Sequence, residues 1–227
     1  MTDEQIVLVG GLWLDAPVWD GVVAELATRG RHAVAVRLPG QGDGNTTATL
    51  DDQLDAVLAA VDAAPGGSVV VGHSAACSLA WLAADARPST VSRVVLIGGF
   101  PPADGDSYAD FFPIEEGVMP FPGWAPFEGP DAADLDDRAR REFAAAAVPV
   151  PEQVARGTVR LTDTRRYEVP VALVCPEFSP AQAQALIDAG DLPELAKARR
   201  VDLVDIDSGH WPMLSRPVEL AGILADL

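Results

Sequence analysis

The strongest constraint on the fold of this chain is a regular alternation of short β-branched runs with longer segments of helical periodicity. The runs that read as strands cover residues 6–9, 32–36, 68–71, 91–97, 169–174 and 201–206. The helix-like segments cover residues 18–28, 50–61, 75–84, 181–189 and 217–227. Strands and helices that alternate in this way form a mostly parallel sheet with helices on both faces. We therefore predict an α/β fold with a doubly wound sheet of about six strands.

The alternation stops between residues 100 and 168. Half of the chain's 14 aromatic residues lie in the first part of this segment, among several prolines, which remove backbone donors and fix φ. They are Phe100, Tyr108, Phe111, Phe112, Phe121, Trp124 and Phe127. The alanine-rich stretch 131–147 predicts a helix with Asp131 as its N-cap. We predict one core, made of residues 1–99 and 169–227, and a cap insertion at residues 100–168.

Length and charge exclude several classes of function. The 227 residues fit one compact domain. The 34 acidic residues exceed the 16 Lys and Arg and give a net charge of −18, which repels nucleic acids and anionic membranes. No apolar run approaches the roughly 20 residues that span a bilayer, and no signal-peptide pattern opens the chain, so we expect a cytoplasmic protein. Cys77 and Cys175 match no metal or redox spacing, and we expect neither a metal nor a cofactor.

A candidate nucleophile lies where the strand at 68–71 runs into a helix of small residues. The sequence Gly72-His73-Ser74-Ala75-Ala76 has the G-x-S-x-A form of a nucleophile elbow. The turn must be sharp and strained to expose the serine Oγ, and it requires small residues such as Gly72 and Ala76 two positions to either side. A helix that begins at Ala75 also points backbone N–H groups at an oxygen that becomes negative during acyl transfer. We predict that Ser74 is the nucleophile.

A candidate general base follows the last predicted strand. His210 lies in the sequence Ser208-Gly209-His210-Trp211, on a loop that can reach the sheet edge where Ser74 lies. The chain order of serine before histidine is typical of this type of site. We assign the other two histidines to structure: His73 to local packing or hydrogen bonding, and His32 to the start of a strand.

These motifs together resemble the α/β-hydrolase superfamily over nearly the whole chain outside the cap insertion. The nearest likeness is to small esterases similar to plant methyl esterases and hydroxynitrile lyases. The motifs are Gly10-Gly11-Leu12-Trp13 with Trp19, Arg37-Leu38-Pro39-Gly40-Gln41-Gly42, and the two segments around Ser74 and His210. The resemblance implies the α/β-hydrolase fold and an oxyanion hole formed by the backbone N–H groups of Leu12 and Ala75. The chain departs from the family at Gly10, where a histidine is usual, and at Arg37, where an aspartate is usual; neither change removes a backbone donor.

The acid of the catalytic triad is the least defined part of this resemblance. The family position after the penultimate strand falls at Phe178 or Ser179, and neither is acidic. An alternative position in some relatives, after the strand at 91–97, is glycine here. Glu177 is the first candidate and Asp104 the second, and a Ser–His dyad assisted by a backbone carbonyl is the third. Loss of such an acid lowers turnover by roughly 10⁴.

The resemblance implies a serine hydrolase that cleaves a carboxylic ester through an acyl-enzyme. The substrate-binding candidates are Gly11, Trp13, Phe100 and Trp211. The aromatic residues of the cap insertion either line an apolar pocket above Ser74 or anchor the insertion to the core. Because the insertion has few basic residues before Arg138, we expect a small, neutral, apolar ester or lactone. A lyase, a thioesterase, a carbon–carbon hydrolase and a non-catalytic ligand-binding protein on the same scaffold remain alternatives.

Overall fold

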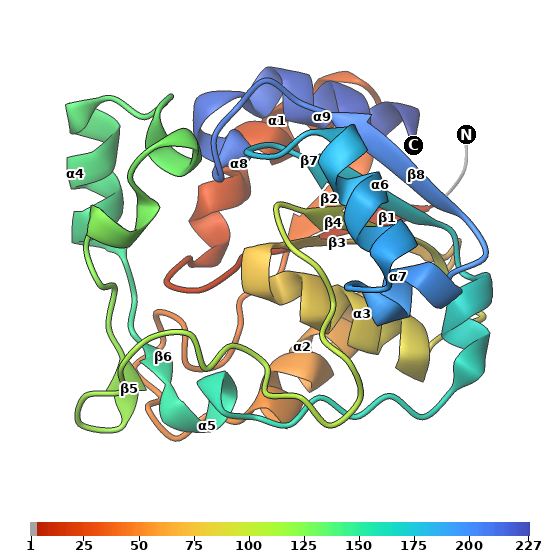
Figure 1. Ribbon diagram of the computed structural model, residues 1–227, viewed down its shortest axis with the longest axis horizontal. Coiled ribbons are helices and arrows are strands. Elements are labelled where there is room, and N and C mark those ends of the chain that lie inside the picture. The colour runs from red at the N-terminus through yellow and green to blue at the C-terminus, as the bar shows by residue number, and fades with distance from the viewer. Residues whose placement is uncertain (1–3) are drawn as a thin grey trace.

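A computed structural model of the chain describes residues 4–227 and has a six-stranded parallel sheet at its centre (Figure 1). The sheet order is β2-β1-β3-β4-β7-β8. The strands are β1 (Gln5–Val9), β2 (His32–Ala35), β3 (Ser68–His73), β4 (Val91–Ile97), β7 (Val171–Cys175) and β8 (Val201–Asp205). This confirms the predicted doubly wound α/β sheet.

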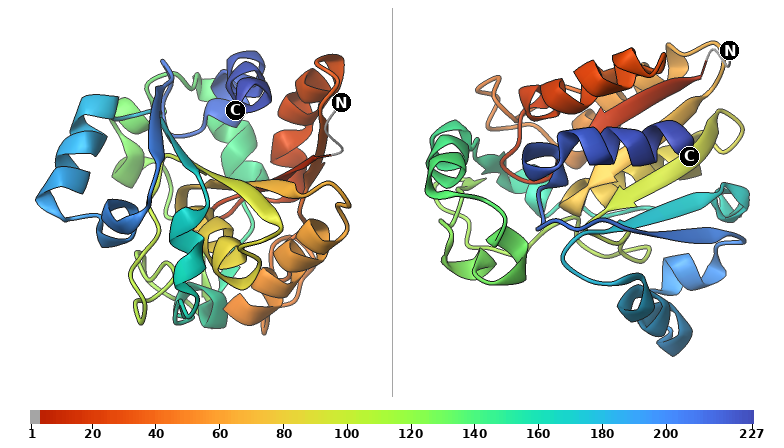
Figure 2. Two further views of the ribbon diagram at one scale, coloured as in Figure 1. Left: turned by 90° about the vertical axis from the view of Figure 1, so that its right-hand side faces the viewer. Right: turned by 90° about the horizontal axis from the view of Figure 1, so that it is seen from above.

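Helices cover both faces of the sheet (Figure 2). On one face, α1 (Asp20–Thr28) packs against α9 (Pro217–Asp226). The other face carries α2 (Leu50–Asp62), α3 (Cys77–Ala86), α6 (Pro180–Ala189) and α7 (Pro193–Lys197). Alternate residues of β1 pack on opposite faces of the sheet. Val7 and Val9 belong to the hydrophobic cluster that includes α2 and α3, and Ile6 and Leu8 belong to the cluster that includes α1 and α9. A strand buried on both faces reads as a continuous apolar run, which is why the sequence pattern identified it.

The predicted cap insertion, residues 100–168, lies between β4 and β7 in the chain. It contains the antiparallel pair β5 (Val118–Met119) and β6 (Val150–Pro151) and the helices α4 (Asp137–Ala146) and α5 (Glu152–Ala155). Figure 1 shows α4 at the far left, apart from the helices that cover the sheet. Seven aromatic rings connect the insertion to the core through centroid contacts of 5.1 to 6.1 Å. They are Trp13, Phe112, Phe121, Trp124, Phe127, Phe143 and Trp211.

The prediction of one helix over residues 131–147 was wrong at its start. The helix α4 begins at Asp137, and the side chain of Asp136, not Asp131, accepts the capping hydrogen bond from the amide of Ala139 at 2.8 Å. Residues 130–132 form a separate 3₁₀ turn. The physical reason is tertiary: the carbonyl of Asp131 and the carboxylate of Asp134 bond to the loop that carries His210, which keeps this stretch out of the helix.

Both cysteines, Cys77 and Cys175, are free and buried. Burial raises the pKa of the Cys77 thiol well above its usual range and that of the Cys175 thiol to about 11. Neither side chain is therefore a ready thiolate at neutral pH. In the part of the chain from residue 4 onward, no helix is both long and apolar enough to cross a membrane.

A buried ion cluster ties the end of the cap insertion to α3 and α7. The guanidinium of Arg166 lies 3.1 Å from the Asp85 carboxylate and 2.9 Å from the Glu194 carboxylate, and none of the three side chains is more than 6% exposed. The indole N–H of Trp81 on α3 donates to the same Glu194 carboxylate at 3.0 Å. Lys197, whose side chain is 57% exposed, lies 3.5 Å from the other Glu194 oxygen, so the cluster reaches the surface at α7.

We expect Arg166→Met to lower the free energy of unfolding by about 3 to 5 kcal/mol, because it leaves the buried Asp85 carboxylate without its cation and leaves Glu194 with only the exposed Lys197 at 3.5 Å. Urea unfolding measures the effect. Arg165→Met is the matched control, since Arg165 is 68% exposed and pairs with Asp163 at the surface, and we expect a far smaller effect from it. Equal losses in the two variants would contradict a structural role for the cluster.

Candidate active site

A sharp turn at the end of β3 holds Ser74. Its φ of +54° lies in the left-handed region that non-glycine residues rarely adopt. A Cβ at Gly72 would come within 2.2 Å of the Ala76 carbonyl oxygen, and one at Gly99 within 2.5 Å of the Ser74 carbonyl oxygen. Only glycine fits at either position. The surrounding backbone thus holds the serine in a strained conformation at the carboxyl edge of the sheet.

His210 and Glu177 reach the same edge from the ends of β8 and β7. The Oγ of Ser74 lies 2.9 Å from Nε2 of His210, and Nδ1 of His210 lies 2.8 Å from Oε1 of Glu177. The His210 and Glu177 side chains are only 14% and 16% exposed. The structure therefore brings the predicted nucleophile, the predicted base and the first acid candidate into one hydrogen-bonded series.

The other acid candidates have different roles in the structure. A carboxylate oxygen of Asp104 accepts the backbone N–H of Leu161 at 2.8 Å. At the positions where the family resemblance placed the acid, Ser179 caps α6 and the Phe178 ring contacts the Phe100 ring at 5.3 Å. Glu177 lies before the helix cap and is therefore free to face His210.

The loop after β1 approaches Ser74 closely because it contains glycine. A Cβ at Gly11 would lie 2.8 Å from the His73 carbonyl oxygen and 3.0 Å from the Ser74 Cβ. This approach lets Leu12 line the same pocket as Ser74, while Ala75 follows Ser74 directly in the chain. The side-chain amide of Gln41, which is buried, donates to the Gly11 carbonyl at 3.4 Å. The sequence analysis gave Gln41 no role, although its glycine-rich motif was the available signal.

Three further groups hold the loop that carries His210. Nε2 of His73 lies 2.7 Å from the His210 carbonyl oxygen and donates to it, since a carbonyl only accepts. From the cap insertion, the Asp131 carbonyl accepts the His210 N–H at 2.7 Å, and the Asp134 carboxylate accepts the Gly209 N–H at 2.8 Å. Local packing or hydrogen bonding was predicted for His73, but its partner lies 137 positions along the chain. The contacts of Asp131 and Asp134 with this loop leave no local pattern in the sequence.

Two pockets meet at Ser74. The small pocket, of about 220 Å³, is lined by Leu12, Trp13, His73, Ser74, Phe111, Phe112, Phe127, His210 and Trp211. The wide pocket, of about 550 Å³, includes Ser74, Ala75, Phe100, Tyr108, Phe111 and Phe178 among its lining residues. Of the predicted substrate-binding residues, Trp13 and Trp211 line the small pocket and Phe100 the wide one. Gly11 lines neither and instead lies against the backbone of the turn at Ser74.

We expect His73 to make the protein less stable in acid. Burial lowers the pKa of His73 well below 6.5, so as the pH falls below that value the unfolded chain takes up a proton that the folded chain refuses. The free energy of unfolding then falls by up to about 1.4 kcal/mol per pH unit, and the stabilisation by neutral His73 is fully present above pH 6.5.

Urea unfolding across this pH range tests the expectation. The free energy of unfolding should change less steeply with pH in His73→Gln, whose amide can still donate to the His210 carbonyl. His32→Gln, at an exposed position, should keep the original slope; an unchanged slope in His73→Gln would contradict the account.

Comparison with known proteins shows the family and the fold of this chain. The model of the Alpha/beta hydrolase family matches residues 6–223. An extracellular α/β-hydrolase from a Paenibacillus species, described as homologous to tobacco salicylic acid binding protein 2, superposes with a TM-score of 0.80 at 20% identity over 98% of both chains.

Two further solved structures share the fold. A pyrethroid hydrolase from Sphingobium faniae has a TM-score of 0.70 at 22% identity, and tomato methylketone synthase I has 0.73 at 19%; each covers 98% of this chain and 96% of its own. No curated protein sequence matches significantly. The family match extends over nearly the whole chain and supports a hydrolytic function. Because of this match, the protein belongs to the α/β-hydrolase family, with a fold like that of the plant esterases.

Proposed function

We propose that this protein hydrolyses carboxylic esters through an acyl-enzyme on Ser74. The observation that carries the proposal is the hydrogen-bonded series from Ser74 Oγ through the imidazole of His210 to Glu177, at 2.9 and 2.8 Å. A serine hydroxyl is a weak nucleophile until an adjacent base removes its proton. The base must in turn be oriented by a third group. We assign this role to Glu177, whose carboxylate faces Nδ1 of His210.

In the proposed mechanism, Nε2 of His210 takes the Ser74 proton as Oγ bonds to the ester carbonyl carbon. The carbonyl oxygen becomes negative and accepts hydrogen bonds from the N–H groups of Leu12 and Ala75, a contribution of about 3 kcal/mol per donor. When the carbon–oxygen bond to the alcohol breaks, His210 returns the proton to the leaving oxygen. Water, deprotonated by the same histidine, then attacks the acyl-enzyme and releases the acid and free Ser74. Glu177 stabilises the imidazolium in both halves.

The lining of the two pockets supports a small, neutral and apolar substrate. Within residues 4–227, no lysine or arginine lines either pocket, so neither pocket offers a cation to a substrate carboxylate or phosphate. Glu177 and Asp106 line the wide pocket, and their negative charge disfavours anionic substrates further. Aromatic rings supply most of the remaining surface of the small pocket, which suits an alkyl or aryl substituent.

A substrate panel tests the reaction class. It contains neutral alkyl and aryl esters, a lactone, the same esters with an added carboxylate, a thioester and a cyanohydrin, each with Ser74→Ala as the blank. We expect the highest kcat/KM for a neutral ester or lactone and a loss of at least about tenfold when a carboxylate is added. Faster conversion of the thioester or the cyanohydrin would favour those reactions on the same fold. Tight binding of an ester with no turnover would favour a binding protein.

A further inference from the structure

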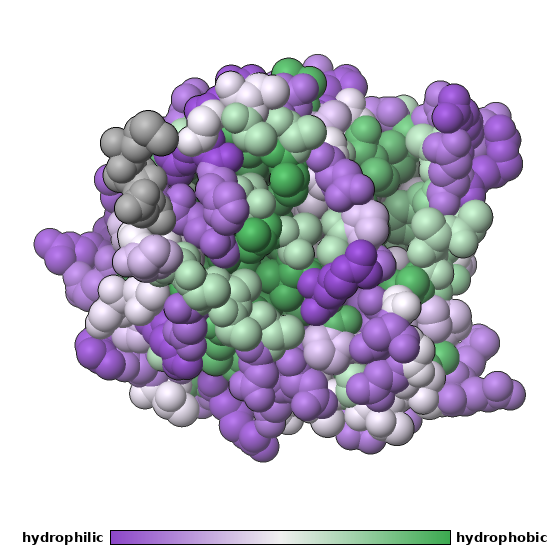
Figure 3. All heavy atoms as spheres, turned by 180° about the vertical axis from the view of Figure 1, so that it is seen from behind, coloured by the Kyte–Doolittle hydropathy of each residue, from purple (hydrophilic) through white to green (hydrophobic). Residues whose placement is uncertain are grey.

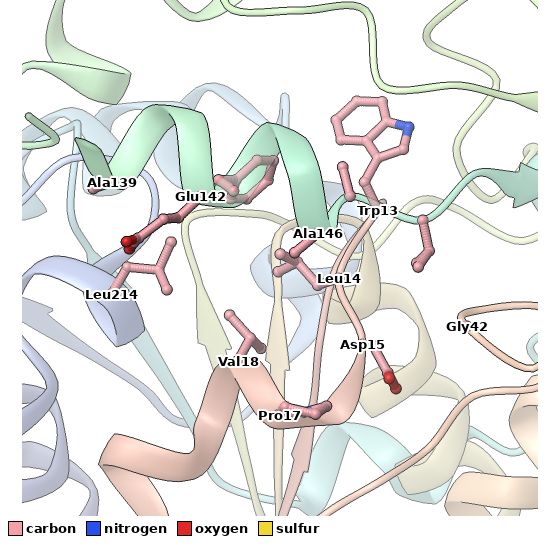
Figure 4. Close-up of a pocket in the computed structure, with 13 residues that line it drawn as sticks. Trp13, Leu14, Asp15, Pro17, Val18, Gly42, Ala139, Glu142, Ala146 and Leu214 are labelled. Atoms are coloured by element: carbon pink, nitrogen blue, oxygen red, sulfur yellow. The ribbon is translucent and has the colours of Figure 1, made fainter. Parts of the chain in front are cut away.

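A third cavity, which we call the side chamber, lies beside the active site, between α4 and the segment from Trp13 to Val18. It measures about 580 Å³, and Trp13, Asp15, Pro17, Val18, Glu142 and Ala146 are among the residues that line it. Figure 4 shows the two sides of it, with Ala139, Glu142 and Ala146 on α4 opposite Pro17 and Val18. In the space-filling view from behind, an apolar hollow lies at the right, next to the projecting part of the molecule (Figure 3).

Among residues 4–227, Trp13 is the one that lines both the side chamber and the small pocket. Trp13 therefore lies in the wall between them. The small pocket, at about 220 Å³, falls below the roughly 300 to 1,000 Å³ of pockets that take drug-sized ligands, whereas the side chamber falls within that range. The small pocket therefore has room for a short substituent of the substrate, and the side chamber on the other side of the wall has room for a long one.

Several contacts hold this wall in place. The indole N–H of Trp13 donates to the Met119 carbonyl at 3.2 Å, and the Trp13 carbonyl accepts the N–H of Val148 at 3.0 Å. The ring packs edge-on against Phe112 and Phe121, with centroids 5.3 and 5.4 Å away. The residue is only 4% exposed.

The chemistry of the side chamber selects an uncharged chain. Its ionisable lining residues are the acids Asp15 and Glu142, which lie on opposite sides of the cavity in Figure 4. Asp15 is paired with Arg37 at 3.7 Å and Glu142 with Arg138 at 2.8 Å. The rest of the lining is largely aliphatic and aromatic, and it has no cation of its own.

We infer that Trp13 sets the maximum length of the substrate substituent that enters the small pocket, and that the side chamber behind it accepts an uncharged alkyl chain once the indole is removed. This inference rests on the proposed esterase function. The substituent that occupies the wide pocket does not meet Trp13, so only one side of the ester bond should respond to the change.

The test compares wild type with Trp13→Gly on two series of esters: 4-nitrophenyl esters from acetate to decanoate, and acetates from methyl to decyl. Glycine suits the φ of +64° at this position, so the substitution removes the wall and relieves backbone strain together. Wild type should lose kcat/KM steeply with chain length in one series. Trp13→Gly should reverse that loss, with a gain of roughly fourfold for each added methylene, while the dependence of kcat/KM on chain length in the other series keeps its wild-type shape.

Trp124→Gly is the matched control, because Trp124 belongs to the same aromatic cluster but lines neither cavity. Its length profile should follow wild type. An unchanged profile in a folded, active Trp13→Gly, or an equal change in Trp124→Gly, would overturn the inference and leave the proposed function standing. If Trp13→Gly fails to fold, Trp13→Leu replaces it as a smaller reduction in side-chain volume. Trp13→Leu should also increase the length of the longest substituent that the enzyme accepts.

A wild-type protein that hydrolyses no ester would contradict the proposed function instead. The role of Trp13 is then tested by ligand binding alone. Calorimetric titration measures the affinity of 1-alkanols, from ethanol to decanol, for Ser74→Ala and for the double variant Ser74→Ala/Trp13→Gly. Tighter binding of the long alkanols in the double variant supports the partition. Equal affinity of both proteins for decanol overturns it.

Discussion

Ser74→Ala should abolish ester turnover, with a fall in kcat of up to roughly 10⁶, and should leave the protein folded. The substitution removes one oxygen, the atom that lies 2.9 Å from Nε2 of His210. Alanine meets the same backbone constraint as serine at φ +54°, and the Cβ is retained, so little stability is lost. Steady-state kinetics measures the loss, and circular dichroism with urea unfolding verifies the fold.

Two comparisons sharpen this result. His210→Ala should lose about as much turnover as Ser74→Ala, and the double variant should lose no more than either, because the two residues act as one unit. Ser78→Ala is the control: its hydroxyl also lines the wide pocket but belongs to α3, away from the hydrogen-bonded series, and the variant should keep wild-type kcat. Substantial turnover in Ser74→Ala would mean that the nucleophile is another group.

Glu177→Gln should lower kcat by roughly 10⁴ while the substrate affinity changes little. The amide has the shape of the carboxylate, but it is neutral and can no longer stabilise the imidazolium. It can also present its NH₂ group to Nδ1, which favours the wrong tautomer of His210. A comparison of kcat and KM on the best ester of the panel measures the effect.

Asp104→Asn is the matched control for the acid, since it makes the same change in the other candidate. The Asp104 carboxylate accepts the N–H of Leu161 and has no contact with His210 among the described hydrogen bonds, so the variant should keep full kcat. The opposite pattern, a loss in Asp104→Asn with an active Glu177→Gln, would contradict the assignment. Full activity in both variants would favour a dyad assisted by a backbone carbonyl.

The sequence allowed the sheet and the turn at Ser74 to be predicted because both depend on local patterns. Strands buried on two faces give continuous apolar runs, and the elbow admits only small residues at Gly72 and Ala76. The helix at α2 also begins at the predicted residue, because Thr49 and Asp52 form a capping box that is visible in the sequence.

Features that depend on contacts between distant segments were not predictable in the same way. The helix α4 begins later than predicted because residues near Asp131 form hydrogen bonds with the loop of His210, about 79 positions further along the chain. The contact of His73 with the His210 carbonyl has the same long-range origin. The choice of Glu177 over Asp104 required the geometry, which places the Glu177 carboxylate against the imidazole and the Asp104 carboxylate against the N–H of Leu161. The partition formed by Trp13 is a property of two cavities and has no counterpart in the sequence pattern.

The most direct test of the central claim is the reaction of the protein with a fluorophosphonate, followed by its intact mass and by mapping of the modified residue. The account predicts a stoichiometric adduct on Ser74 that forms rapidly in wild type, is absent in Ser74→Ala and forms far more slowly in His210→Ala. A folded wild-type protein that forms no adduct, or one modified equally fast without His210, would contradict an activated serine at this site.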